Sequence, residues 1–282
     1  KYECIHHFML FLFRIKTESK VKLYMEYGIC QVVLSPGRTE PADQSEIQLQ
    51  LVFGDLVYVL EVRNNWTFIK MAKYAYSCWV DSKHICALQE EEFNQIYSQR
   101  EVRVRDISAS LREVETKEIT HLVKGCLLPN FDNGFTSFCS QRYEFLGTTN
   151  HACIQKKEEL ARTVKEYVNA PYLWGGTSPF GIDCSGLTQM CYALHGFQLP
   201  RDAKDQALMG ETIDFLEEAE PGDLAYFDNQ EGVITHVGIL VEGNNIIHAS
   251  GKVRIDKIDH EGIYREDWEK YTHKLRIIKR LF

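Results

Sequence analysis

The sequence predicts an α+β protein in which one or two small β-barrels precede a C-terminal domain of helices followed by an antiparallel sheet. Three observations lead to this prediction: short β-type segments up to residue 149, a helical periodicity after Gly147, and strand-like segments from residue 222 onward. The 282 residues exceed one typical domain of about 100–200 residues. We therefore predict three parts: residues 1–92, 93–150 and 151–282.

The first barrel is predicted between residues 28 and 88. Its segments "CQVVL", "LQLVFGDLVYVLEV", "WTFIKMA" and "CWVDS" are rich in β-branched and aromatic residues. A polar loop at 35–46 and short turns separate them, a spacing typical of a small barrel. Residues 100–149 repeat this character less regularly, with a "DNG" turn, and predict a second small barrel.

The C-terminal part begins with helices. Apolar residues fall on one helical face before Pro171, and again over residues 184–195. A short helix is expected after Pro200. The later segments "GDLAYF", "THVGILV", "NIIHAS", "KVRIDKI" and "HKLRIIKRLF" predict strands, with a hairpin turn at 242–245.

Composition excludes several classes of function. The net charge of −8 and the lack of a basic stripe exclude nucleic acid as a partner. The apolar run at residues 8–13 is far shorter than the roughly 20 residues of a membrane span, so we expect a strand or helix that packs on the next domain. No cofactor and no metal are predicted.

The cysteines bear on the compartment. There are nine of them, an odd number without a CxxC pair, which does not indicate a disulfide framework or a zinc ribbon. A reducing compartment follows as the simpler interpretation. We therefore expect a cytoplasmic protein, with export to the periplasm or cell surface as the alternative.

Cys184 is the candidate nucleophile, because it opens the helix predicted at 184–195. Unpaired N–H groups and the helix dipole at that position favour a thiolate and are expected to lower the thiol pKa. His236 lies in an apolar strand and is the candidate base. His248, in the next strand of the predicted hairpin, is expected to accept the Nδ1–H of His236 and so orient its ring toward Cys184.

Six blocks of sequence carry a family resemblance. In order they are "PYLWGG", "GIDCSGL", "LPRDAKDQ", "PGDLAYF", "THVGILV" and "NIIHASG". They resemble the NlpC-type cysteine peptidases, which cut bacterial cell-wall peptides and have a papain-like fold. Residues 27–82 are similar to the bacterial SH3-like domain that precedes this catalytic domain in γ-D-glutamyl-L-diamino-acid endopeptidases of the dipeptidyl-peptidase VI type.

The resemblance implies a role for each matching residue. Cys184 is the nucleophile, His236 the general base and acid, and His248 the orienting third member. The hydroxyl of Tyr172 and the N–H of Cys184 are expected to stabilise the oxyanion. Seven residues are implied to bind substrate: Asp183, Ser185, Trp174, Arg201, Asp202, Glu46 and Tyr76.

Some of these residues have a second interpretation. Asp183 and Asp202 are equally expected to cap the helices that follow them. Glu40 and Tyr74 are the alternatives to Glu46 and Tyr76 as the residues that hold the free amine of the substrate. Trp174 is as readily an aromatic packed against the Gly-Gly turn.

The implied activity is hydrolysis of the γ-D-glutamyl to L-diamino-acid bond in murein peptides with a free N-terminal L-Ala, which releases L-Ala-D-Glu. The partners are then murein-derived peptides, and the chain is expected to be a monomer. Two alternatives are a murein-binding protein with a vestigial catalytic domain and a Cys-His amidase or acyltransferase. A metal site built from Cys184, His236 and His248 is a third, although no closely spaced second ligand pair accompanies it.

Overall fold

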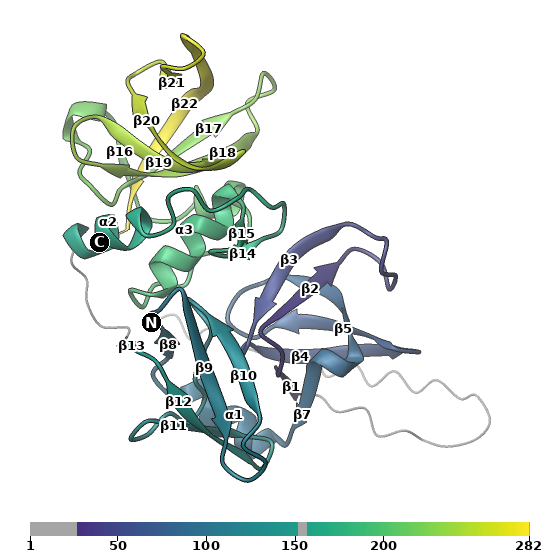
Figure 1. Ribbon diagram of the computed structural model, residues 1–282. Coiled ribbons are helices and arrows are strands. Elements are labelled where there is room, and N and C mark those ends of the chain that lie inside the picture. Colours follow the sequence, from purple (N-terminus) through teal and green to yellow (C-terminus); the bar gives the residue numbers. More distant parts are fainter. Residues whose placement is uncertain (1–26, 152–156, 282) are drawn as a thin grey trace, which may run out of the picture.

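The computed structural model describes residues 27–151 and 157–281 (Figure 1). The apolar run at residues 8–13 lies outside them. Strands prevail throughout, and the chain folds into an N-terminal sheet, a second set of strands and a C-terminal unit in which helices come before the sheet. No helix in the described ranges is both long and apolar enough to cross a membrane.

The first part is a seven-stranded sheet in the order β3-β2-β6-β5-β4-β1-β7. Gly54, at φ +87°, turns the chain between β3 and β4, at the Gly-Asp turn that the sequence indicated. The strands are β1 (Tyr27–Cys30), β2 (Leu34–Arg38), β3 (Ile47–Val52), β4 (Leu56–Arg63), β5 (Trp66–Met71), β6 (Ser77–Asp81) and β7 (Ile85–Leu88), with a 3-10 turn at Ser82–His84.

The predicted loop at 35–46 is wrong at its start, because residues 35–38 belong to β2. Pro36 is tolerated there because β2 pairs with β3 on one side and meets β6 only at Arg38 on the other. A proline lacks an N–H, and a strand position without a second partner does not need one.

The second part begins with helix α1 (Glu90–Ser98), which runs across residues 92 and 93, where the sequence suggested a boundary. The helix buries Phe93 and Ile96. A four-stranded sheet in the order β10-β9-β12-β11 and a two-stranded sheet β13-β8 follow. Their strands are β8 (Val102–Val104), β9 (Ser108–Glu113), β10 (Ile119–Val123), β11 (Phe135–Phe138), β12 (Gln141–Leu146) and β13 (Thr149–His151).

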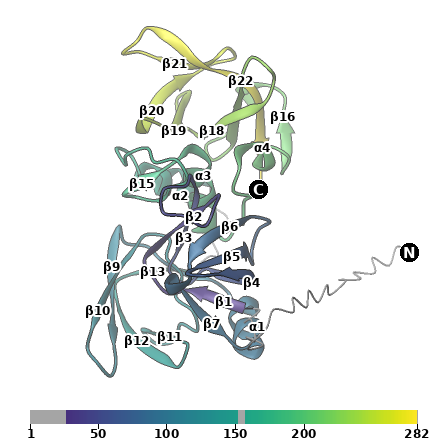
Figure 2. The same ribbon diagram turned by 90° about the vertical axis from the view of Figure 1, so that its right-hand side faces the viewer.

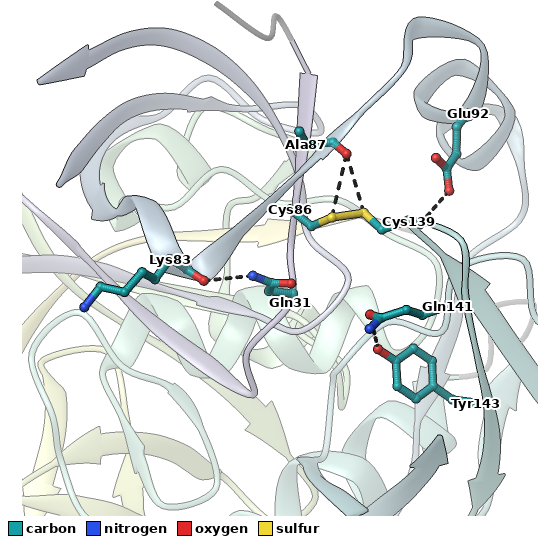
Figure 3. The surroundings of a disulfide bond; sticks show 8 residues. All are labelled: Gln31, Lys83, Cys86, Ala87, Glu92, Cys139, Gln141 and Tyr143. Atoms are coloured by element: carbon teal, nitrogen blue, oxygen red, sulfur yellow. Dashed lines mark hydrogen bonds between the residues drawn. A yellow bond between two sulfur atoms is a disulfide. The ribbon is translucent and has the colours of Figure 1, made fainter. Parts of the chain in front are cut away.

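A disulfide joins the first two parts, contrary to the expectation from the cysteine pattern. Cys86 in β7 bonds to Cys139, which follows β11 (Figure 3). The backbone N–H of Cys139 also donates to the Glu92 carboxylate of α1 at 2.9 Å. The described free thiols are Cys30, Cys78, Cys126, Cys184 and Cys191.

The third part has the predicted order of helices before sheet. Its helices are α2 (Lys157–Lys165), α3 (Cys184–Ala193) and α4 (Ala203–Gln206), with a small hairpin of β14 (Thr177–Ser178) and β15 (Gly181–Ile182) between α2 and α3. The predicted helices before Pro171, at 184–195 and after Pro200 are therefore confirmed. A 3-10 turn at Leu216–Glu218 precedes the main strands.

The C-terminal strands are antiparallel in the order β16-β22-β17-β18-β19-β20-β21, and a further pairing of β22 with β21 closes β17 to β22 into a barrel. The predicted hairpin of β18 and β19 is confirmed, with Gly238 opposite His248. The strands are β16 (Glu211–Ile213), β17 (Leu224–Asp228), β18 (Ile234–Val241), β19 (Asn245–Ser250), β20 (Lys252–Ile258), β21 (Gly262–Arg265) and β22 (Lys270–Arg280).

One hydrophobic core runs through all three parts. It joins Phe53 of the first sheet, Leu111 of the second and Leu187 of α3 in a single buried cluster. Helix α3 lies between the C-terminal sheet and the two N-terminal parts in both views (Figures 1 and 2). Gly125 makes this contact close, since a Cβ atom there would lie 2.4 Å from the Met190 sulfur.

Candidate active site

The predicted nucleophile lies at the start of α3. The carboxylate of Asp183 accepts a hydrogen bond from the N–H of Gly186 at 2.7 Å, so the helix begins at Cys184 and the predicted capping role of Asp183 is confirmed. Every residue of α3 is buried, and Cys184 is 7% exposed. The thiol therefore sits at the N-terminal end of a central helix.

Glycines let the preceding turn pack directly on this helix. A Cβ atom on Gly186 would lie 2.2 Å from the carbonyl oxygen of Gly176, and one on Gly176 would lie 2.4 Å from that of Gly181. Neither position has room for a side chain. The glycines of "WGG" and "CSG" thus hold the turn against the first turn of α3.

His236 and His248 are brought together by the β18–β19 hairpin. Because Gly238 is opposite His248, His236 lies two residues along on the same face of the sheet. His236 Nε2 and His248 Nδ1 are 2.8 Å apart. The expected contact through His236 Nδ1 is therefore wrong, and Nδ1 is the nitrogen left for the thiol.

Strand β18, which carries His236, contacts the start of α3. Val237 follows His236 in β18, and its backbone N–H forms a hydrogen bond that favours the Cys184 thiolate. Helix α3 also packs on β18 and β19. The strand that carries His236 thus contacts the helix end that carries Cys184, and His236 and His248 contact each other.

Two further groups at this site were not predicted from the sequence. Asp256 Oδ2 lies 2.8 Å from His248 Nε2, on the side of the ring away from His236. The His273 ring of β22 stacks on the His236 ring, with centroids 4.1 Å apart and planes 23° apart. The alternation of "KVRIDKI" puts Asp256 on the same face as Arg254, which is the one signal that could have indicated it.

The histidine cluster does not fit a metal ion. Ring nitrogens of His236, His248 and His273 lie within 4.8 Å of one another, and no other such group occurs among the described residues. Both nitrogens of His248 already form hydrogen bonds, to His236 and Asp256. Cys184 is not in this group, so the alternative of a site formed by Cys184, His236 and His248 gains no support.

Burial controls the titration of the thiol and the imidazole. Burial, followed by the Asp183 carboxylate, raises the pKa of the Cys184 thiol to about 11. The expected lowering by the helix dipole is thus outweighed. Burial and the neighbouring His248 and His273 hold the pKa of His236 well below its usual value. Burial thus favours the neutral form of both the thiol and the imidazole.

Asp183, Ser185 and Arg201 form a buried polar cluster behind Cys184. Arg201 pairs with the Asp183 carboxylate and donates to Ser185 Oγ at 2.8 Å. Asp183 Oδ2 also accepts the N–H of Gly175 at 2.8 Å. The structure thus brings these three predicted binding residues together, with their polar groups engaged with one another.

Tyr172 and Asp202 flank this cluster. Burial, and then the negative charge of an ionised Cys184, raises the pKa of Tyr172 to about 12, so its hydroxyl stays protonated and can donate near the thiol. Asp202 occupies the N-cap position of α4, yet its carboxylate makes no capping hydrogen bond. Asp202 is therefore at the predicted N-cap position, but the predicted capping hydrogen bond is not formed.

The first sheet reaches the site through β3. The Trp174 indole N–H donates to the Glu46 carboxylate at 2.8 Å, and Thr177 Oγ1 donates to the carbonyl of Gln50 at 3.1 Å. Gly175, at φ +80°, lies so close to Ile47 that a Cβ atom would be 2.9 Å from the Ile47 carbonyl oxygen. Glu46 and Trp174 thus meet where the first part and the C-terminal domain join.

Tyr76 also lies at this junction. Burial, and then the Asp202 carboxylate, raises the pKa of Tyr76 to about 12, which puts the phenol within electrostatic reach of α4. The alternative residue, Tyr74, instead lines a cavity with Asp55 and Arg103 between the domains. Of the two tyrosines, Tyr76 is the one whose pKa the Asp202 carboxylate raises.

A buried thiol at a helix start, beside a histidine held by hydrogen bonds, is the arrangement of a cysteine peptidase. A model of the NlpC/P60 family matches residues 169–276, and a model of the bacterial dipeptidyl-peptidase SH3 domain matches residues 37–85. The chain thus contains an NlpC/P60 domain preceded by a bacterial dipeptidyl-peptidase SH3 domain, and it is a cysteine endopeptidase.

Similar proteins cover most of the chain. The gamma-D-glutamyl-L-lysine dipeptidyl-peptidase of Bacillus subtilis is 29% identical over 72% of this chain and 72% of its own length. Dipeptidyl-peptidase 6 of Lysinibacillus sphaericus is 28% identical over 81% and 90%. The crystal structure of an NlpC/P60 family protein from Bacillus cereus has a TM-score of 0.77 at 20% identity and covers 90% of this chain and 99% of that chain, which shows a shared fold.

Proposed function

We propose that this peptidase hydrolyses the γ-D-glutamyl to L-diamino-acid bond of murein peptides with a free N-terminal L-Ala and releases L-Ala-D-Glu. The observation that carries the proposal is the junction at Trp174, where Glu46 of the SH3 domain lies beside the C-terminal domain that holds Cys184. Two relatives named dipeptidyl-peptidases, similar over both domains, support it. The helix-first order of the C-terminal domain supports a papain-like layout.

The proposed reaction proceeds through an acyl-enzyme. His236 Nδ1 takes the thiol proton as Cys184 Sγ attacks the γ-carbonyl carbon of D-Glu. Tyr172 and the N–H of Cys184 stabilise the oxyanion; such a donor contributes about 3–4 kcal/mol. The tetrahedral adduct then expels the diamino-acid amine, which takes the proton from His236. Finally, His236 deprotonates a water that cleaves the thioester, giving a carboxylate and the free thiol.

Substrate selection follows from the same geometry. Glu46 offers a carboxylate to the free α-amine of L-Ala, and Tyr76, within electrostatic reach of Asp202, is a second candidate contact. Asp183, Ser185 and Arg201 supply the polar wall next to Cys184, where the α-carboxylate of D-Glu is expected. Trp174 then serves to fix the Glu46 carboxylate.

The test is mass spectrometry of L-Ala-γ-D-Glu-diaminopimelate after incubation with the protein, beside its L-Lys counterpart, its N-acetylated form and intact murein. Release of L-Ala-D-Glu from free-amine peptides alone is expected. Equal cleavage of all substrates would leave a general wall hydrolase. Binding of murein without cleavage would favour the vestigial enzyme, and cleavage only of other amides would favour an amidase or acyltransferase.

The compartment and the oligomeric state are further proposals. A monomer is expected, and sedimentation velocity tests it. The disulfide of Cys86 and Cys139 favours the exported alternative over the cytoplasm, because disulfides persist mainly in oxidising compartments. Fractionation of cells that produce the protein, with thiols trapped at lysis, tests both the compartment and the oxidation state.

A further inference from the structure

The hydrogen bonds at the active site continue beyond the predicted third residue. His236 Nε2 contacts His248 Nδ1 at 2.8 Å, and His248 Nε2 contacts Asp256 Oδ2 at 2.8 Å. His248 is fully buried and Asp256 is 7% exposed. Both nitrogens of His248 are thus engaged, one by each neighbour.

We infer that Asp256 is a positioning residue that fixes the proton positions on both His248 and His236, so that His236 Nδ1 is free to take the thiol proton of Cys184. The inference rests on the proposed roles of Cys184 and His236. Asp256 acts through His248 and does not touch the reacting atoms.

The donor and the acceptor in each of these hydrogen bonds follow from the chemistry of a carboxylate. An ionised carboxylate only accepts hydrogen bonds, so His248 must carry its proton on Nε2. A neutral His248 then has no proton on Nδ1, and that nitrogen accepts from His236 Nε2–H. A neutral His236 is in turn unprotonated at Nδ1, which is the form a general base requires.

The surroundings keep the Asp256 carboxylate ionised and in place. Burial acts to raise its pKa, but hydrogen bonds from His248 and Arg254 outweigh this and hold it below the usual value. Arg254 Nε donates to Oδ2 at 2.5 Å, and Arg254 Nη2 donates to Oδ1 at 2.8 Å. Asp267 holds Arg254 from the other side at 3.2 Å.

The Arg254 contact also makes the site intolerant of an amide. An Asn at position 256 has one oxygen and one NH₂ group, whereas His248 and Arg254 present donors to both carboxylate oxygens. At least one donor would therefore face the NH₂ group: Arg254 Nη2 in one orientation of the amide, and His248 Nε2 with Arg254 Nε in the other. If His248 Nε2–H is such a donor, its proton moves to His248 Nδ1. The donor and acceptor roles in the His248–His236 hydrogen bond are then reversed.

Titratable and charged groups face His248 from several strands. They are His236 of β18, Arg254 and Asp256 of β20, Arg265 of β21 and His273 of β22. Asp256 is the one acid among them that bonds to His248. Its charge is expected to favour the imidazolium that forms when Cys184 gives up its proton.

The experiment compares Asp256→Asn with a matched control, Asp259→Asn. Asp259 lies in the turn after β20 and accepts a hydrogen bond from the Tyr271 hydroxyl at 2.5 Å. In the described contacts it touches none of the three active-site histidines. We expect Asp256→Asn to lower kcat/KM by about 10- to 100-fold, the range for hydrogen-bond partners of metal-binding histidines. The acid limb of its pH profile, which reports protonation of His236, should move to lower pH because the Asp256 charge that favours the imidazolium is lost, and Asp259→Asn should match wild type in both.

Two readouts do not depend on the substrate. The rate of iodoacetamide alkylation at Cys184 can be followed by peptide mass spectrometry as a function of pH. Its acid limb should also move to lower pH in Asp256→Asn. Nitrogen-15 spectra of the wild-type imidazoles should report the protons of neutral His236 and His248 on Nε2, with the signals assigned by single histidine substitutions. The wild-type spectrum is informative even if Asp256→Asn does not fold.

A proton on Nδ1 of neutral His248 in wild type would overturn the inference, as would unchanged kcat/KM and alkylation in a folded Asp256→Asn. Failure of the proposed substrate looks different. In that case the murein peptide is not cut by the wild type, while the Cys184 alkylation profile and the imidazole spectra still respond to Asp256.

Discussion

The Glu46 carboxylate of the SH3 domain and the Trp174 indole N–H of the catalytic domain are joined by a 2.8 Å hydrogen bond across the domain junction. Trp174 is 59% exposed, so this acid is held at the surface near the site rather than in the core. An acid fixed in this way is suited to a cationic group of a short substrate.

The first prediction concerns that acid. Glu46→Gln keeps the indole contact through its amide oxygen but removes the charge. KM for the free-amine tripeptide should rise at least about 10-fold, since a charge-assisted hydrogen bond of about 1.5–3 kcal/mol is lost. The N-acetylated peptide should remain uncut by Glu46→Gln, as by the wild type. Glu61→Gln, a surface acid paired with Arg63, is the control, and Glu40→Gln tests the alternative assignment.

The second prediction concerns the nucleophile. Cys184→Ala should abolish turnover, because no other thiol occupies the N-terminus of α3, and its melting temperature should stay close to that of wild type. Cys191→Ala, in the same helix and fully buried, should retain turnover. Residual activity of Cys184→Ala above a few per cent of wild type would rule out the proposed acyl-enzyme.

The third prediction concerns stability in acid. Burial, followed by His248, lowers the pKa of His273 to about 4, against an unfolded value near 6.5. The unfolded chain therefore binds more protons between these values, and the free energy of unfolding falls as pH drops through this window. Wild type should lose about 1–2 kcal/mol more than His273→Phe between pH 7 and 4, a figure reduced for partial exposure.

Urea unfolding at a series of pH values measures this difference. Asp55, whose pKa burial raises to about 6, acts in the opposite direction, since its protonation below pH 6 favours the folded state. It is present in both proteins and cancels in the comparison. Parallel pH curves for the two proteins would contradict the prediction.

The fourth prediction concerns the disulfide. Cys86 and Cys139 are separated by 53 residues, and opening a loop of that size should lower the free energy of unfolding by about 2–4 kcal/mol. Urea unfolding of wild type with and without dithiothreitol measures the loss. The variant with both Cys86→Ser and Cys139→Ser should unfold like reduced wild type and show no response to the reductant. An equal free energy of unfolding of the wild type with and without dithiothreitol would contradict the predicted contribution of the disulfide.

The sequence predicted the elements whose signals are local. The helix at Cys184 and the hairpin of His236 and His248 follow from periodicity and turn residues, and both are present. Helix α1 was missed because only Phe93 and Ile96 mark its buried face. Strand β21 was missed because it has only four residues.

What the sequence could not predict depends on the tertiary structure. The role of Asp256 requires the register of β20 on β19, and the stacking of His273 requires the closure of the barrel. The raised pKa of Cys184 comes from burial, which outweighs the helix terminus. The partner of Cys86 lies 53 residues away, and no spacing rule links the two.

The single core that joins the three parts has a consequence for where a peptide is cut. Phe53, Leu111 and Leu187 belong to one buried cluster, so the SH3 domain is not a loosely tethered module. Glu46 and Cys184 are then a constant span apart. If the substrate amine binds at Glu46, this fixed distance sets the position of cleavage relative to the free amino end. The peptide is then cut after its second residue, whatever residues follow in the substrate.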